Sequence, residues 1–208
     1  MSSSGNRLRL ARMLALATVL YGLVFYFVGA YLKPGYSQVT HYISELNATG
    51  TAWATELGWF GFVPIAALFA AFLVVAQPIA RVTGASRLGF LLLWTQPIAF
   101  LGVALAPCDP GCSIGGSALQ QIHDLLGVGT YFPAALGLFL LSYAPGLSTV
   151  GKIFFRVAAI AWLLLFLLML MPELAPVRGL LQRIADGLLG MAVLLIAWHM
   201  LGPTPQNR

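Results

Sequence analysis

LARMLALATVLYGLVFYFVGAYL, residues 10–32, is the stretch that decides the fold. It carries a single charged residue, Arg12, and about 20 apolar residues are enough for a helix to cross the hydrocarbon core of a bilayer. The run is longer than the apolar region of a signal peptide, about 7–15 residues, and no small-residue cleavage site follows it. We therefore expect it to be retained as a first membrane span.

Five further apolar stretches follow the first one. The six predicted spans are Leu10–Leu32, Leu57–Gln77, Leu88–Pro107, Ile122–Tyr143, Ile153–Met171 and Leu180–Leu201. The chain has 208 residues, of which 60% are hydrophobic and 8% are charged, and its mean hydropathy is +0.89. These values exclude a water-soluble globular protein and a disordered chain. We predict an all-α bundle of six transmembrane helices that forms one domain over residues 1–208. A five-span alternative would leave the last segment at the membrane interface.

Basic residues predict the orientation of the bundle. With the N-terminus in the cytoplasm, the cytoplasmic side carries eight lysines and arginines and the outside carries three. The two groups are Arg7, Arg9, Arg12, Arg81, Arg87, Lys152, Arg156 and Arg208 inside, and Lys33, Arg178 and Arg183 outside. The positive-inside rule then predicts that both termini lie in the cytoplasm. This topology accounts for the net charge of +5, so no nucleic-acid partner is needed.

The acidic residues lie on the opposite, outer side. They are Glu45, Glu56, Asp109, Asp124, Glu173 and Asp186, and His41 and His123 accompany them. Acidic residues contribute little to orientation, so their clustering is a separate observation. Either they are ordinary loop acids, or this face of the protein carries a site.

The first outer loop contains the segment Thr40–Gly50, which reads as a short helix too short to span the membrane. Helical spacing would put His41 and Glu45 one turn apart on a common face, with Ser44 beside them. We expect an interfacial or re-entrant helix over the bundle. It is either a solvated loop helix or the wall of an outward-facing site.

The loop between the third and fourth spans holds the only two cysteines, Cys108 and Cys112. An Asp-Pro-Gly turn lies between them and brings their backbones close enough for a disulfide. Asp109 belongs to this turn. We predict a structural disulfide. A catalytic thiol pair usually has Cys-x-x-Cys spacing, which this loop lacks. We also predict no metal site, because two cysteines alone are a poor zinc ligand set.

Charged residues also enter the membrane spans. His123 and Asp124 open the fourth span, where they either cap the helix or serve a site. Arg183 and Asp186 lie three residues apart in the last span, so they either neutralise each other or open a polar pocket in which Arg183 binds an anionic head group. Proline occurs within spans two, three and four, at Pro64, Pro97 and Pro133, where it can kink helices and open space.

These motifs together resemble a bacterial membrane-protein family known as domain of unknown function 998 (DUF998). The resemblance rests on Ile43-Ser44-Glu45-Leu46 with Ala48-Thr49-Gly50, the Cys108-Asp109 loop, His123-Asp124, and Arg183. It covers nearly the whole chain in order and hydropathy. Membership implies a six-helix inner-membrane protein and brings no established reaction.

Three functions compete at this point. The first is a site that acts on or binds a lipid or lipid-linked substrate at the outer leaflet. There His41 or His123 is the general base, Asp124 or Glu45 orients it, and Ser44 is a nucleophile. Arg183, Asp186 and Asp109 would bind the substrate. The second is a small-molecule transporter or sensor, and the third is an accessory subunit that binds a membrane-protein partner. The sequence identifies no cofactor.

Overall fold

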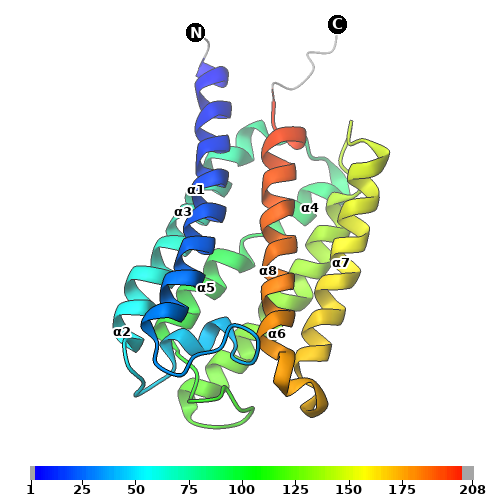
Figure 1. Cartoon of the computed structure of the whole chain (residues 1–208). Helices are drawn as coiled ribbons and strands as arrows, with labels where there is room; N and C mark the ends of the chain where they lie inside the picture. The colour runs from blue at the N-terminus through cyan, green and yellow to red at the C-terminus, as the bar shows by residue number, and fades with distance from the viewer. Residues whose placement is uncertain (1–2, 203–208) are drawn as a thin grey trace, which may run out of the picture.

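The computed structural model describes residues 3–202 (Figure 1). Six helices in it are long and apolar enough to cross a membrane. They are Ser4–Leu32, Ala54–Ile79, Gly84–Leu105, Ala118–Leu141, Thr149–Met169 and Pro172–Met200. No strand occurs between residues 3 and 202, where a single isolated bridge joins Ala80 to Leu201. The prediction of an all-α bundle is confirmed, and the helix ends differ from the predicted ones by up to eight residues.

Several spans are divided into shorter elements. The longer elements are α1 (Ser3–Leu32), α3 (Val63–Ala76), α4 (Gly84–Leu92), α5 (Thr95–Leu105), α6 (Ala118–Leu141), α7 (Thr149–Met169) and α8 (Arg178–Leu195). The shorter ones are η1 (Ile43–Asn47), α2 (Ala54–Leu57), η2 (Gly58–Phe62), η3 (Gln77–Ile79), η4 (Pro172–Val177) and η5 (Ile196–Met200).

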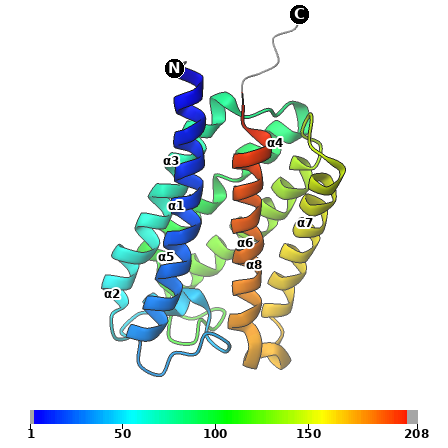
Figure 2. The same ribbon diagram turned by 45° about the horizontal axis from the view of Figure 1, so that its top comes forward.

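The helices are arranged as a ring. α1 packs on α3, α3 on α5, α5 on α6, α6 on α7 and α7 on α8, and the ring closes where α8 meets α1, its loosest junction (Figures 1 and 2). The beginning of α1 and the end of the last helix lie at the same end of the bundle (Figure 1). We call the opposite end, which holds residues 33–53, the cysteine loop and η4, the polar end. Arg208, one of the predicted cytoplasmic charges, lies outside the described residues.

The prolines coincide with irregular helix geometry in two spans. In the second span a π-helical turn, η2, precedes Pro64. The third span breaks between α4 and α5 at Leu93 and Trp94, shortly before Pro97. Because proline has no N–H and crowds the preceding turn, it favours such breaks. In the fourth span α6 continues through Pro133.

Glycines allow α4 and α6 to cross closely. A Cβ atom on Gly89 would overlap the carbonyl oxygen of Gly137, and one on Gly137 would crowd the carbonyl oxygen of Gly89. Small residues permit such approach between membrane helices. The larger of the two core clusters includes Phe90 and Leu138 beside this crossing, and the fully buried Phe72, Phe155 and Trp162.

The predicted helix in the first loop of the polar end exists, as the 3-10 helix η1. All five of its residues are buried, so it is part of the bundle's packing. It begins at Ile43, after His41. The expectation that His41 and Glu45 share a helical face is therefore wrong, because the chain before Ile43 forms a turn in which His41 N–H donates to Ser37 O at 2.9 Å.

Candidate functional site

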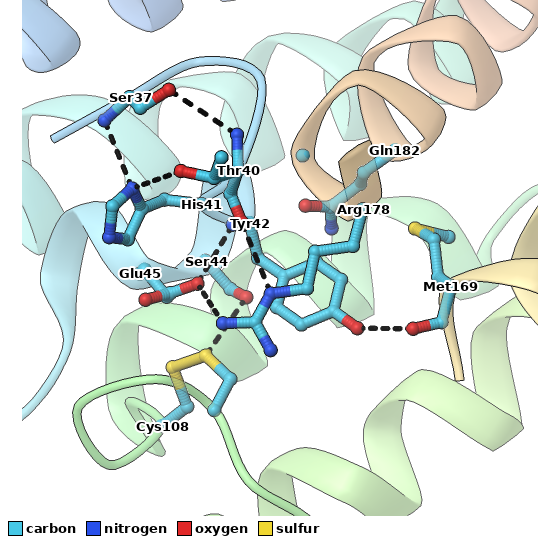
Figure 3. Close-up of polar contacts among 12 residues, drawn as sticks. Ser37, Thr40, His41, Tyr42, Ser44, Glu45, Cys108, Met169, Arg178 and Gln182 are labelled. Atoms are coloured by element: carbon cyan, nitrogen blue, oxygen red, sulfur yellow. Dashed lines mark hydrogen bonds and ion pairs between the residues drawn. A yellow bond between two sulfur atoms is a disulfide. The ribbon is translucent and has the colours of Figure 1, made fainter. Parts of the chain in front are cut away.

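An ion pair fastens η1 to the beginning of α8. Arg178 Nη2 lies 3.2 Å from Glu45 Oε1, and the Glu45 side chain is 6% exposed (Figure 3). The same Glu45 oxygen accepts a hydrogen bond from Tyr42 N at 2.9 Å, which closes the first turn of η1. Glu45 therefore has a local structural partner and a partner on α8.

Tyr42 extends this connection to α7. The Arg178 guanidinium lies 4.5 Å from the centre of the Tyr42 ring, and the Tyr42 hydroxyl donates to Met169 O at 2.7 Å (Figure 3). Gln182 on α8 adds a further tie, because its Oε1 accepts from Ile43 N at 2.6 Å. The start of η1 is thereby held against both α7 and α8.

His41 is occupied within its own loop. Its Nδ1 accepts a hydrogen bond from Ser37 N at 3.0 Å and lies 3.1 Å from Thr40 Oγ1 (Figure 3). Its ring stacks on Tyr36, with the ring centres 5.3 Å apart. The predicted base at this position is thus engaged in shaping residues 36–41.

Arg183 binds the same loop and not Asp186. Its Nη1 donates to His41 O at 3.1 Å and to Gly179 O at 2.9 Å, and its Nη2 donates to the Tyr36 hydroxyl at 2.6 Å. Asp186 Oδ2 instead accepts from the Tyr26 hydroxyl at 2.7 Å. Within residues 3–202 the one salt bridge is Arg178–Glu45, so mutual neutralisation of Arg183 and Asp186 is not observed.

The cysteine loop is closed by the predicted disulfide between Cys108 and Cys112, whose Cα atoms lie 5.1 Å apart. Asp109 fastens this loop to the start of α6, because its two carboxylate oxygens accept from Ser117 N at 2.7 Å and Ser117 Oγ at 2.8 Å. Asp124 accepts from Gly115 N at 3.1 Å and Gln120 Nε2 at 2.6 Å. Both acids therefore order the loop that precedes α6.

His123 faces the disulfide from the first turns of α6. Its Nδ1 lies 3.0 Å from Ala106 O. Because a carbonyl oxygen only accepts, Nδ1 carries the proton in the neutral ring and Nε2 is left as an acceptor. One candidate ligand atom from each of Cys108, Cys112 and His123 lies within 4.8 Å of the others. Since both sulfurs belong to the disulfide, they offer no thiolate, and these residues do not fit a zinc site.

A small polar cavity lies inside the bundle at the level of these residues, and we call it the central cavity. Its volume is about 90 Å³. The polar side chains that line it are Ser44, Gln96, His123, Thr130, Tyr131, Gln182 and Asp186. Gln96 stands out, because it is 2% exposed and its amide nitrogen has no hydrogen-bond partner within residues 3–202. A bound molecule with an acceptor group would satisfy this nitrogen.

Two larger cavities adjoin the central one. The polar-end pocket, about 430 Å³, shares Ser44, His123 and Gln182 with it and is also lined by Asp124 and Arg178. The second cavity, about 340 Å³, runs between α1 and α8 and shares Phe100 and Asp186 with the central cavity. We call it the α1–α8 groove. The three cavities thus adjoin through shared walls.

Burial and hydrogen bonding shift the pKa values of three ionisable side chains in the polar-end loops. Burial lowers the pKa of Lys33, with nearby Glu45 opposing this shift; Lys33 Nζ donates to Leu46 O at 3.0 Å. Burial likewise raises the pKa of the Tyr42 hydroxyl, which the neighbouring Arg178 partly offsets. Hydrogen bonds from Ser117 lower the pKa of Asp109. Asp109 is therefore held as an anion that anchors its loop.

The structure gathers only some of the predicted site residues. Ser44, His123 and Asp186 line the central cavity, whereas Asp124 lines only the adjoining polar-end pocket. The Ser44 hydroxyl contacts Cys112 Sγ at 3.5 Å, and no described hydrogen bond joins it to a histidine. The catalytic and substrate-binding roles assigned from the sequence stay predictions.

Sequence reasoning did not single out several residues that shape this region. They are Tyr26, Tyr42, Gln96, Tyr131, Arg178 and Gln182. One signal was present in the sequence, since Gln96 and Gln182 are uncharged polar residues within apolar spans, where polar groups need a partner.

Comparison with known proteins identifies the family. The family model described as "Protein of unknown function (DUF998)" matches residues 15–199, and the chain belongs to this family. No curated protein and no solved structure matches the chain. The resemblance found from the short motifs is confirmed, and the family supplies no activity.

Proposed function

We propose that the protein binds a lipid or lipid-linked substrate at its polar end. In this proposal it is a multi-pass protein of a bacterial inner membrane with both termini in the cytoplasm, and the polar end faces outward. The ligand comes from the outer leaflet and places its head group in the central cavity.

The unpaired amide of Gln96 is the observation that carries this proposal. A buried donor without a partner costs about 1–3 kcal/mol, and polar groups inside membrane bundles commonly mark binding sites. Gln96 lies beside a cavity whose other polar groups include acceptors and donors, among them Gln182 and Thr130. A head group with hydroxyl or amide functions would satisfy these groups.

The surroundings of the cavity support a ligand that is amphipathic. The α1–α8 groove adjoining it is largely apolar and lies within the membrane-spanning part of both helices. The polar-end pocket leads instead toward the loops. His123 Nε2 would act as an acceptor for the head group and, if the bound molecule reacts, as its general base.

Replacing Gln96 by leucine is expected to reduce ligand binding without destabilising the protein. The substitution removes the donor that the ligand satisfies, and it also removes an unpaired buried polar group, so thermal stability should be unchanged or higher. We expect about tenfold less of the specifically retained lipid, which corresponds to one lost hydrogen bond. Lipid extracted from the purified protein, quantified by mass spectrometry, measures this.

Thr95→Val is the matched control for this experiment. Thr95 precedes Gln96 on α5, but its hydroxyl donates to Leu92 O at 2.8 Å and does not line the central cavity. This variant should retain the lipid. Equal retention by the Gln96→Leu protein, or the absence of any specifically retained lipid in the unaltered protein, would contradict the proposal.

The proposed orientation has its own test. In a protein whose Cys108 and Cys112 are replaced by serine, single cysteines are introduced at Thr49 and Ala85, which are both exposed. A membrane-impermeant maleimide added to intact cells should label position 49 and not position 85, because the positive-inside rule puts the polar end outside. The reverse pattern would place the site in the cytoplasm.

A further inference from the structure

Arg183 is a cation without an anionic partner. Its hydrogen bonds go to uncharged acceptors, because Nη1 donates to His41 O and Gly179 O and Nη2 donates to the Tyr36 hydroxyl. It forms no salt bridge within residues 3–202. A charged side chain inside a membrane bundle usually pairs with an opposite charge. The positive charge of Arg183 is therefore not neutralised at short range within the described part of the chain.

One donor of this guanidinium is also unused. Arg183 Nε is buried and has no hydrogen-bond partner within residues 3–202. Buried donors without a partner are rare, and each one requires an explanation. Because the hydrogen bonds at Nη1 and Nη2 fix the plane of the guanidinium, its Nε–H is held in a constant direction. A bound acceptor would satisfy it, and an anionic acceptor would neutralise the charge as well.

Arg183 lines the α1–α8 groove at the end nearest the loops. Gln38, from the loop that follows α1, also lines the groove and supplies an amide donor. From Arg183 the α8 wall continues to Leu194, about 16 Å along the helix axis at 1.5 Å per residue, and most of its lining is apolar. Phe27 and Met191 of this lining are exposed. The groove thus matches an amphiphile, with polar groups near the loops and an apolar body within the membrane.

The one acidic side chain of the groove has a partner of its own. Asp186 accepts from the Tyr26 hydroxyl at 2.7 Å, and it also lines the central cavity. Arg183 and Asp186 are the two charged residues in the groove lining. An anion in the groove would be attracted by Arg183 and repelled by Asp186. The two charges therefore contribute to binding with opposite signs, which an experiment can separate.

We infer that the α1–α8 groove binds a lipid with an oxyanion in its head group, a phosphate or a carboxylate, which accepts from Arg183 Nε. The chain of this lipid lies between α1 and α8. Arginine binds such oxyanions more strongly than it binds neutral acceptors. Because Arg183 does not line the central cavity, this is a second site. The inference goes beyond the proposed function, and either can hold without the other.

Photo-crosslinking in phosphatidylcholine nanodiscs tests this site. The probes are a lysophosphatidic acid with a diazirine near the end of its chain and a monoacylglycerol with the same chain, which lacks the phosphate. The lysophosphatidic acid should label groove residues such as Leu23 and Leu194 about tenfold more strongly, as expected for one hydrogen bond to a charged group. Excess unlabelled lysophosphatidic acid should compete. Inorganic phosphate at the same concentration should not, because it lacks the chain.

Asp186→Asn tests the position of the charge, and its expected gain cannot arise from misfolding. Asparagine keeps an acceptor for the Tyr26 hydroxyl and removes the repelling charge, so labelling by lysophosphatidic acid should rise about threefold. Labelling by monoacylglycerol should not change. Asp124→Asn is the matched control, because Asp124 lines the polar-end pocket and not the groove.

Arg183→Met should lower labelling by lysophosphatidic acid about tenfold. Elution as a single species from a sizing column verifies that this variant folds. If it does not fold, the comparison of Asp186→Asn with Asp124→Asn still decides.

Each other outcome overturns the inference. Equal labelling by the two probes would reject the oxyanion, and displacement by inorganic phosphate would show that the site takes a small anion and not a lipid. An Asp186→Asn protein without a gain would place the head group away from Arg183. Loss of labelling in the Gln96→Leu protein would place the head group in the central cavity and reject a second site. A protein that fails the Gln96 retention test but gives the expected labelling would lose the proposed function and keep this site.

Discussion

Replacing Gly179 by alanine is expected to release residues 38–41 from α8 and to lower the stability of the protein. A Cβ atom at Gly179 would overlap the carbonyl group of His41 and crowd Gln38 O, and backbone atoms cannot rotate away as side chains can. The backbone of Leu180 also donates to Val39 O at 3.0 Å, so the loop is in direct contact with the first turn of α8.

The size of this effect follows from two opposing contributions. Alanine is favoured over glycine within a helix by about 1 kcal/mol, whereas overpacking typically costs about 1–3 kcal/mol and more where backbone must move. We expect a net loss of about 2 kcal/mol. Thermal unfolding in detergent measures the loss, and faster hydrogen exchange at residues 37–41 reports the freed loop.

Gly187→Ala is the matched control on the same helix. A Cβ atom at Gly187 meets nothing within 4 Å, so only the gain in helix propensity applies and stability should rise slightly. A Gly179→Ala protein as stable as this control, with unchanged exchange in the loop, would show that the loop does not depend on close contact with α8.

The membrane spans could be predicted from the sequence because hydropathy acts locally. Each stretch of about 20 apolar residues must form a helix to satisfy its backbone in lipid, whatever its neighbours are. The ends of the spans are less determined. The last helical stretch begins at Pro172, before the predicted Leu180, because η4 precedes α8 without an apolar signal.

The disulfide was predictable for a similar reason. Cys108 and Cys112 are joined by a short turn whose Asp-Pro-Gly sequence sets its geometry. The pairing of Tyr26 with Asp186 was not predictable, because the two residues are 160 positions apart and meet only where the ring of helices closes. Local spacing suggested Arg183 as the partner of Asp186, but the loop of residues 36–41 provides Arg183 with closer acceptors.

The partner of Glu45 illustrates the same limit. Helical periodicity suggested His41, four residues earlier, yet Glu45 accepts from Tyr42 N and so begins a 3-10 helix that excludes His41. Its ionic partner, Arg178, lies 133 positions away. In the sequence Arg178 looked like an ordinary loop charge, because its role depends on the packing of η1 against α8.

Removing Glu45 is expected to be among the most damaging single changes at the polar end. Glu45→Ala leaves Arg178 without its counter-ion and Tyr42 N without its acceptor, and breaking a buried ion pair costs about 3–5 kcal/mol. We expect a loss near the lower limit, about 3 kcal/mol, because the Arg178 side chain is 23% exposed. Thermal unfolding of the purified protein measures the change.

Further variants separate the charge of Glu45 from its other contacts. Glu45→Gln keeps an acceptor for Tyr42 N and should be less destabilised than Glu45→Ala. Arg178→Met leaves a buried carboxylate unpaired, so the double variant should lose less stability than the sum of the two single variants. Glu173→Ala removes an exposed acid of η4 and should change stability little. If Glu45→Ala unfolds at the same temperature as Glu173→Ala, the Arg178–Glu45 pair does not hold η1 on α8. The wall of the central cavity that contains Ser44 must then be fixed by the other contacts of η1, such as the bond from Ile43 N to Gln182.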